Sequence, residues 1–109
     1  MRWYDRLRRR SEIAHIRRRG RRISLASVTA FVLPEDGRTL RIAIAAAKSV
    51  GTAVVRNRIR RRIRGAFEAL GPGKDAPGML FLVVRDEAVG LPYSRIVEDV
   101  RILLGRVAR

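Results

Sequence analysis

Hydrophobic and polar residues alternate most regularly over residues 39–48, in the stretch "TLRIAIAAAK". An alternation of period two predicts a β-strand, because successive side chains of a strand point to opposite faces. One face carries Leu40, Ile42, Ile44 and Ala46, and the other carries Arg41, Ala43, Ala45 and Ala47. The second face is shallow, so either a packed helix or a ligand could approach the sheet closely there.

Two further stretches have the composition of strands. Residues 27–33, "SVTAFVL", are rich in β-branched and aromatic side chains and precede the turn-forming residues "PEDG". Residues 79–85, "MLFLVVR", are apolar on both faces, which is typical of a central strand. An additional antiparallel strand starting near Arg21 to Leu25 is an alternative that the periodicity leaves open.

Apolar residues spaced three or four apart predict three helices. The first helix is short, with Ser11 as its N-cap and Gly20 as a left-handed residue after its last turn. The longer helices are expected from Thr52, as N-cap, to Leu70, and from Pro92 or Tyr93 to Val107. The segment "GPGKDAPG" ends the second helix.

The order of these elements describes an α+β fold. We expect a two-layer α/β sandwich whose small sheet is mostly antiparallel, with helix, two or three strands, helix, strand and helix in sequence. The 109 residues fit a single domain, residues 1–109. A hydrophobic content of 47% with four prolines is too apolar for a disordered basic tail.

The net charge of the chain indicates what kind of partner it binds. The chain has 25 lysines and arginines against ten acidic residues, a formal net charge of +15. A small fold with so much positive charge repels itself, and a polyanion would relieve that repulsion. The absence of cysteine excludes disulfides and thiolate chemistry and is compatible with a cytoplasmic location. The apolar runs are far shorter than the roughly 20 residues that span a bilayer, so no membrane partner is expected.

The positive charge is concentrated on the second predicted helix. At about 100° per residue, Asn57, Arg60, Arg61 and Arg64 share one face, and Arg56, Arg58 and Arg62 flank it. No acidic residue occurs from position 48 to position 66. A merely solvated face would mix glutamates among the arginines, so this pattern favours a surface that binds phosphates.

Other kinds of chemistry find little support. The sequence "AAAKSVG" lacks the preceding glycines of a phosphate-binding loop, and His15 is the only histidine, which excludes a histidine metal cluster. The adjacent acidic pairs are explained by salt bridges or caps, and a Mg²⁺ site shared with a nucleic acid is an alternative; these pairs are Glu35/Asp36, Asp86/Glu87 and Glu98/Asp99.

The stretch "KSVGTAVVRNRIRRRIRGAF", Lys48 to Phe67, resembles the signature of the bacterial ribonuclease P protein subunit, K-x-x-G-x-A-V-x-R-N-R-x-[KR]-R. A looser similarity extends from Leu7 to about Arg106. The resemblance implies an RNA-binding subunit that assists a catalytic RNA in removing the 5′ leader of precursor tRNA. The RNA and its bound Mg²⁺ would perform the chemistry, and the protein alone would not be catalytic. A left-handed crossover through the arginine helix is also implied, against the usual right-handed rule.

The resemblance implies two sets of binding residues. The catalytic RNA would contact Lys48, Arg56, Asn57, Arg58, Arg60, Arg61 and Arg64. The single-stranded leader would lie in a cleft formed by Ile13, Arg17, Phe31, Ala45 and Ser49. Members of the family typically carry phenylalanines where this chain has Ile13 and Arg17, so at Arg17 guanidinium stacking or a phosphate contact would replace a stacked ring. Arg17, Arg19, Arg21 and Arg22 would also strengthen the field that attracts RNA.

Two other classes of protein are alternatives. A small ribosomal protein or RNA chaperone could use the same arginine helix without a catalytic partner. A sequence-specific DNA-binding module would need a helix-turn-helix pair, whereas strands flank the arginine helix here. The expected partners are therefore the catalytic RNA and precursor tRNA, and the sequence makes no prediction about oligomeric state.

Overall fold

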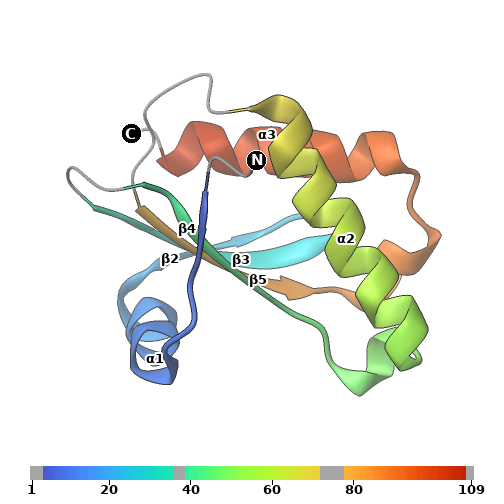
Figure 1. The fold of residues 1–109 in the computed structure, drawn as a ribbon, viewed down its shortest axis with the longest axis horizontal. Coiled ribbons are helices and arrows are strands. Elements are labelled where there is room, and N and C mark those ends of the chain that lie inside the picture. Colours follow the sequence, from blue (N-terminus) through green and yellow to red (C-terminus); the bar gives the residue numbers. More distant parts are fainter. Residues whose placement is uncertain (1–3, 36–38, 72–77, 108–109) are drawn as a thin grey trace.

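The computed structural model describes residues 4–35, 39–71 and 78–107, and its strands form one five-stranded sheet in the order β1-β4-β5-β3-β2 (Figure 1). In chain order the elements are β1 (Asp5–Arg6), α1 (Arg10–Arg19), β2 (Arg21–Ser24), β3 (Val28–Pro34), β4 (Arg41–Ala45), the 3-10 turn η1 (Lys48–Val50), α2 (Ala53–Leu70), β5 (Gly78–Val84), the 3-10 turn η2 (Asp86–Gly90) and α3 (Tyr93–Val107). The turn predicted at Asp36 and Gly37 and most of the loop predicted after α2 lie outside the described residues.

The expected α+β fold is confirmed, and its sheet is mixed, with antiparallel pairing over more residues than parallel pairing. β5 pairs antiparallel with β3 and parallel with β4, β2 pairs antiparallel with β3, and β1 pairs parallel with β4. Both parallel pairs involve β4. Helix α2 returns the chain so that β5 runs in the same direction as β4. The other parallel partner, β1, is only two residues long and was not predicted from the sequence. The β4–α2–β5 connection expected from the resemblance is therefore present, and its left-handed sense stays a prediction.

Helices cover the two faces of the sheet unequally. Helices α2 and α3 pack side by side on one face, and α1 lies against part of the opposite face (Figure 1). The sheet with α2 and α3 forms the expected two-layer sandwich, and α1 adds a partial third layer. None of the described helices covers the rest of the face on the α1 side (Figure 1).

The main core lies between the sheet and the helices α2 and α3. Ile59, Ile63 and Phe67 of α2 are buried against the strands, as the stripe of apolar residues predicts. The alternation in β4 is confirmed as well, because Leu40 and Ile42 are buried on this side. A smaller core on the α1 side contains Leu7, Ile16, Met79 and Phe81.

The ends of α1 differ from the prediction. Ser11 lies inside the helix, and Arg9 occupies the N-cap position without a side-chain cap. Gly20 is extended, with φ −72° and ψ 156°, so it is not a left-handed residue. A Cβ atom at Gly20 would lie 2.5 Å from the Ile16 carbonyl oxygen and 3.1 Å from that of Val32. Glycine is required here because two backbone segments approach closely.

A buried polar link ties α3 to the start of β3. Asp99, only 1% exposed, accepts hydrogen bonds from the Ser27 backbone nitrogen at 2.9 Å and from the Ser27 hydroxyl at 2.6 Å. Arg95 lies one helical turn before Asp99, with its Nε 3.4 Å from the other carboxylate oxygen. Ion pairs predicted for the acidic residues also occur at Glu35 with Arg41 and at Glu87 with Arg85.

Candidate nucleic-acid interface

The arginine-rich helix α2 is anchored at its start and along its buried stripe. The Thr52 hydroxyl accepts a hydrogen bond from the Val55 backbone nitrogen at 3.3 Å, which confirms Thr52 as the N-cap. Buried Ile59 and Ile63 fix the side of the helix that faces the sheet. Burial of such side chains contributes roughly 1.5–3 kcal/mol each, more than the ~0.2–0.5 kcal/mol lost at each pair of like charges one turn apart. The helix can therefore hold crowded arginines.

The polar face predicted on α2 forms one side of a hollow on the surface. This hollow is lined by Ile44 of β4 together with Asn57, Arg60, Arg61 and Arg64. The Arg60 guanidinium donates a hydrogen bond of 2.9 Å to the side-chain oxygen of Asn57. That bond leaves the amide nitrogen of Asn57 available as a donor, so the hollow presents several N–H groups and few acceptors.

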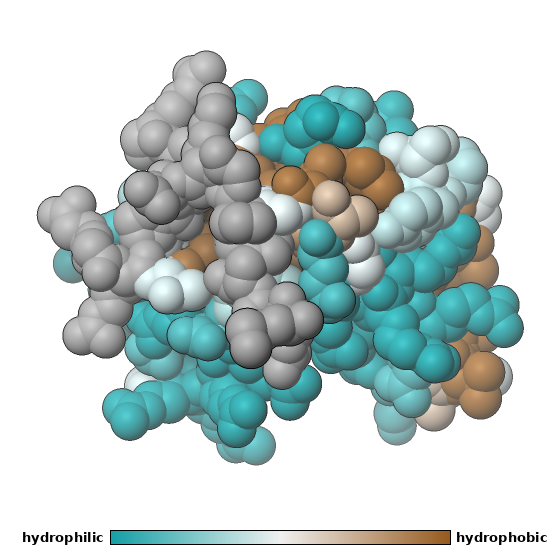
Figure 2. Space-filling model, turned by 45° about the horizontal axis from the view of Figure 1, so that its top comes forward, coloured by the Kyte–Doolittle hydropathy of each residue, from teal (hydrophilic) through white to brown (hydrophobic). Residues whose placement is uncertain are grey.

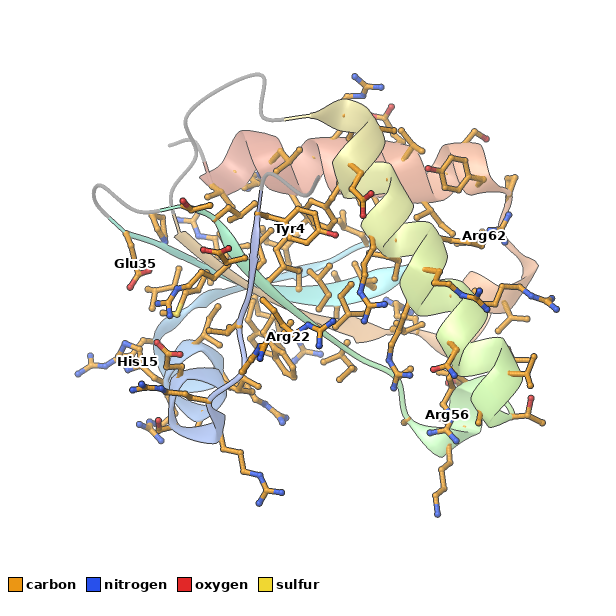
Figure 3. The ribbon with its side chains drawn as sticks, viewed as in Figure 1. Tyr4, His15, Arg22, Glu35, Arg56 and Arg62 are labelled. Atoms are coloured by element: carbon orange, nitrogen blue, oxygen red, sulfur yellow. The ribbon has the colours of Figure 1, made fainter. Side chains whose placement is uncertain are left out.

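The α2 arginines that flank the hollow have different surroundings. Arg56 donates through Nε to the Gly51 carbonyl oxygen at 3.2 Å, and Arg62 lies over the Tyr93 ring at 5.9 Å (Figure 3). Arg58 is exposed, as is Lys48 on η1. In the described part of the chain, no arginine of α2 forms a salt bridge with a carboxylate. Figure 2 shows hydrophilic residues over much of the surface around α2.

Aromatic rings lie on the opposite face of the sheet, beside α1. The strand register places Ala43, Phe81, Phe31 and Arg22 in one row across β4, β5, β3 and β2. The Phe31 and Phe81 rings stack with centroids 6.0 Å apart and an interplanar angle of 28°. Phe31 is half-buried, whereas Phe81 is buried, and the next row toward η1 continues with Ala45 and Val83. This face is a shallow apolar floor.

The exposed side of α1 extends over this floor. The guanidinium carbon of Arg17 lies 5.9 Å from the centroid of the Phe31 ring and 5.8 Å from that of Phe81. Ile13 and Ala45 line a common hollow with Phe81. The predicted residues Ile13, Arg17, Phe31 and Ala45 therefore lie close together, and the Arg17 guanidinium lies over the two rings.

Ser49 lies apart from these four residues. It belongs to η1, and its hydroxyl donates a hydrogen bond of 2.9 Å to Asp86 of η2. Both side chains are exposed, and no described contact joins Ser49 to Phe31 or Ile13. The assignment of Ser49 to the leader cleft therefore stays a prediction.

An ion-pair network holds α1 in position above the floor. Arg41 of β4 donates to Glu12 of α1 at 2.6 Å and to Glu35 at 3.1 Å. The hydrogen bond to Glu12 raises the pKa of Arg41 above its ordinary value, so this guanidinium stays charged. Because the side chains are only about a quarter to a third exposed, the network is less screened than a surface pair. It fixes the distance between α1 and the edge of the sheet.

Two residues of this region were not predicted as binding residues. Phe81 was interpreted only as part of a buried central strand, because its position beside Phe31 depends on β5 lying between β3 and β4. Arg6 lines the same hollow as Ile13 and Phe81, but β1 is too short to give a periodic signal. Neither placement can be read from local sequence alone.

The histidine and the acidic side chains of the described residues do not form a metal site. His15 is exposed and projects from the outer side of α1 (Figure 3). Among the residues that the structure describes, no group of three or more histidine or acidic side chains is arranged to hold a metal ion. None of the described helices is long and apolar enough to cross a membrane.

The structure is that of a small basic α+β protein with a five-stranded mixed sheet, an arginine-rich helix on one face and stacked rings on the other. A helix rich in arginine and a face with aromatic rings are typical of proteins that bind nucleic acids. Comparison with known proteins gives the family. The sequence model of the family described as Ribonuclease P matches residues 1–108. The chain belongs to the ribonuclease P protein family.

Relatives in sequence and in structure agree with this family. The "Ribonuclease P protein component" of Chloroflexus aurantiacus is 35% identical over 105 residues, covering 95% of this chain and 78% of the relative. That of Paramagnetospirillum magneticum is 30% identical over 109 residues, covering 94% and 82%. The solved RNase P protein of Thermotoga maritima has a TM-score of 0.81 at 19% identity, covering 94% of this chain and 96% of that chain. For the protein of Staphylococcus aureus the TM-score is 0.77 at 20% identity, covering 93% of each chain. These two structures support the fold.

Proposed function

We propose that this chain is the protein subunit of ribonuclease P. In this proposal it binds the catalytic RNA and the 5′ leader of precursor tRNA, and it assists the Mg²⁺-dependent removal of that leader. Membership of the family and a formal net charge of +15 both support the proposal. The protein supplies binding and positioning, and the RNA carries out the cleavage.

The observation that carries the proposal is the hollow on α2. Four polar side chains from one helix face reach it, namely Asn57, Arg60, Arg61 and Arg64. Each guanidinium can donate paired hydrogen bonds to phosphate oxygens, and Asn57 can donate to a ribose hydroxyl or a base edge. Lys48, Arg56 and Arg58 would extend the contact along the catalytic RNA. Among the described residues the arginines of α2 have no salt-bridge partner, so an RNA that supplies negative charge would stabilise this helix.

The second contact uses the apolar floor beside α1. Phe31 presents a half-buried ring, and Arg17 lies above it. Unpaired bases stack on aromatic rings with little dependence on sequence, at about 1–3 kcal/mol per base. A single-stranded leader needs such a site, because its sequence differs from one precursor to another. Ile13 and Ala45 would form the apolar sides of the cleft, and Ser49 would lie at its far end.

Mg²⁺ belongs to the RNA partner in this proposal. When bound by RNA, the ion can activate water and stabilise the charge that develops on the scissile phosphate. The residues of this chain would act by holding the leader and the catalytic RNA together. Lower electrostatic repulsion between the two RNAs would then lower the Mg²⁺ concentration that cleavage requires.

The decisive experiment is cleavage of precursor tRNA by the cognate catalytic RNA at low Mg²⁺, with and without the chain. We expect the chain to lower KM or the Mg²⁺ requirement. The double variant Arg60→Gln/Arg61→Gln should lose this effect, whereas Arg101→Gln/Arg106→Gln, which removes the same charge from α3, should keep it. RNA binding without any change in cleavage would instead favour a small ribosomal protein or RNA chaperone.

A further inference from the structure

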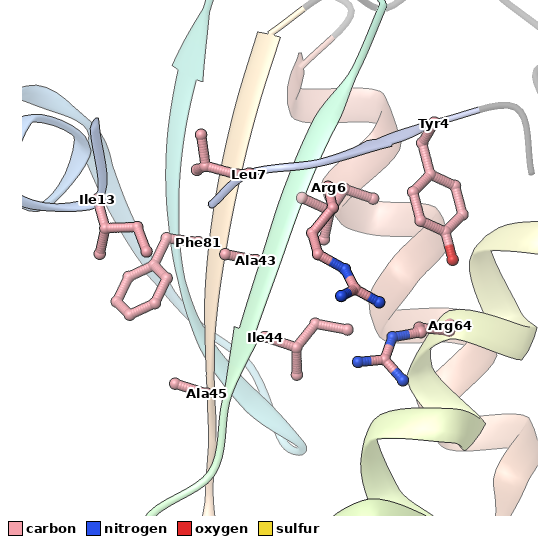
Figure 4. Close-up of a pocket in the computed structure, with 10 residues that line it drawn as sticks. Tyr4, Arg6, Leu7, Ile13, Ala43, Ile44, Ala45, Arg64 and Phe81 are labelled. Carbon is pink, nitrogen blue, oxygen red and sulfur yellow. The ribbon is translucent and has the colours of Figure 1, made fainter. Parts of the chain in front are cut away.

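Two arginines from distant parts of the sequence point into the hollow at the open edge of β4. Arg6 comes from β1 and Arg64 from α2, and both line this hollow (Figure 4). Within the described residues neither guanidinium forms a salt bridge with a carboxylate. Glu68, one turn after Arg64, accepts a hydrogen bond from the Tyr4 hydroxyl at 3.3 Å. Two cations that face the same space repel each other unless an anion lies between them.

The backbone at this edge adds a neutral donor. The backbone nitrogens of Asp5 and Leu7 donate to the carbonyl oxygens of Leu40 and Ile42 at 2.8 and 2.9 Å. The backbone N–H and C=O groups of the even-numbered residues of β4 therefore point toward β1. β1 ends at Arg6, and no described backbone bond from this segment reaches Ile44. The Ile44 N–H therefore faces the open edge, beside the hollow that contains both guanidinium groups.

This edge also connects the two surfaces of the proposed function. Ile44 and Arg64 line both the hollow on α2 and the hollow that contains Arg6. The second hollow continues to Ile13, Ala45 and Phe81 beside α1. An RNA strand that passes around the edge of the sheet would therefore meet the arginine helix, then the pair of guanidinium groups, and then the apolar floor.

We propose that Arg6 and Arg64 together bind one phosphodiester group of RNA at the open edge of β4. The inference rests on the proposed function and adds to it a site that the family signature does not contain. A phosphate has enough oxygens to accept from both guanidinium groups and from a backbone N–H at once. The phosphate can come from the catalytic RNA or from the precursor leader, and the chemistry of the site is the same for both.

The test uses Arg6→Gln, Arg64→Gln and the double variant, with Arg101→Gln/Arg106→Gln as a control of equal charge. One arm measures binding of each protein to the catalytic RNA alone. The other measures binding of precursor tRNA, with and without its leader, to the assembled RNA–protein complex. We expect each single variant to weaken one of these affinities by about tenfold, as for a charge-assisted hydrogen bond. The double variant should weaken it by less than the product of the single effects, because both arginines hold one phosphate.

The two arms identify the source of the phosphate. A loss confined to the first arm assigns it to the catalytic RNA, and a loss confined to leader-bearing precursor assigns it to the leader. Arg6→Lys and Arg64→Lys, which keep the charge but lose the planar fork, should recover part of the affinity. Thermal unfolding of each variant checks that the fold is intact.

Two results separate this site from the proposed function. If the double variant binds like the α3 control in both arms while the unchanged chain still stimulates cleavage, the phosphate site is wrong and the function stands. If the unchanged chain neither binds the catalytic RNA nor stimulates cleavage, the proposed function fails, and the phosphate site fails with it.

Discussion

The guanidinium of Arg17 lies over the ring of Phe31, 5.9 Å from its centroid, although the two residues belong to different elements, α1 and β3. A cation over an aromatic face contributes about 0.5–1 kcal/mol at an exposed site. Arg17 can thus cover the ring without filling the floor as a phenylalanine would. In the proposed leader cleft, Phe31 would be the stacking surface and Arg17 would place a positive charge above it.

Replacing Arg17 by glutamine should weaken the binding of leader-bearing precursor by about two- to fivefold, because the cation above the ring is lost. Binding of tRNA without a leader should not change. The comparison is made by titrating both RNAs into the assembled RNA–protein complex. Arg18→Gln removes the same charge from the neighbouring exposed position and serves as the control. An equal loss from Arg18→Gln would mean that only net charge matters at α1.

Replacing Arg58 and Arg61 together by glutamine should reduce the salt dependence of affinity for the catalytic RNA. Each lost phosphate contact lowers the slope of log K against log salt by about 0.7–0.9, so the double variant should lose about 1.5. Both side chains are exposed, and relief of the repulsion between positions 58 and 62 should leave the free energy of unfolding equal or slightly higher. An unchanged slope would show that these arginines are only solvated.

Replacing Asp99 by asparagine should lower the free energy of unfolding by about 1.5–3 kcal/mol, because the buried carboxylate accepts two hydrogen bonds from Ser27. Ser27→Ala should cost less, since the backbone bond remains. Urea unfolding followed by circular dichroism measures both changes. Glu98→Gln, at the adjacent exposed carboxylate, should change stability by less than about 0.5 kcal/mol. Equal effects at positions 98 and 99 would contradict this account.

Two glycine substitutions should have opposite effects on stability. Gly20→Ala places a Cβ atom 2.5 Å from the Ile16 carbonyl oxygen, so the junction between α1 and β2 must shift, at a cost of about 1–3 kcal/mol. Gly105 lies inside α3 with nothing within 4 Å of its Cβ position. Gly105→Ala should therefore stabilise the protein by about 0.5–1 kcal/mol. Thermal melts of the two variants give the comparison, and a shared direction would refute it.

Residues whose role depends on local spacing were predictable from the sequence. The apolar stripe of Ile59, Ile63 and Phe67 defines both the length of α2 and the side on which its arginines lie, because helical periodicity acts within one element. Thr52 was predicted as the N-cap for the same reason. The strand at 79–85 was expected to be central because both of its faces are apolar, and β5 occupies the middle of the sheet.

Features that depend on pairing between distant segments were not predictable in this way. The stacking of Phe31 on Phe81 requires β5 to lie between β3 and β4, and nothing near either phenylalanine specifies that order. β1 is only two residues long, so its parallel pairing with β4 and the position of Arg6 leave no periodic trace. The extended conformation of Gly20 likewise reflects a close approach to Val32, a contact outside its own helix.

The central position of β5 has a consequence for how the protein folds during its synthesis on the ribosome. Strands β3 and β4 do not pair with each other. Both pair with β5, residues 78–84, which is synthesised after α2. A nascent chain that ends at Leu70 therefore carries an arginine-rich helix with no finished sheet to receive its apolar stripe. Completion of the sheet is a late, long-range step, and it joins the two halves of the protein at once.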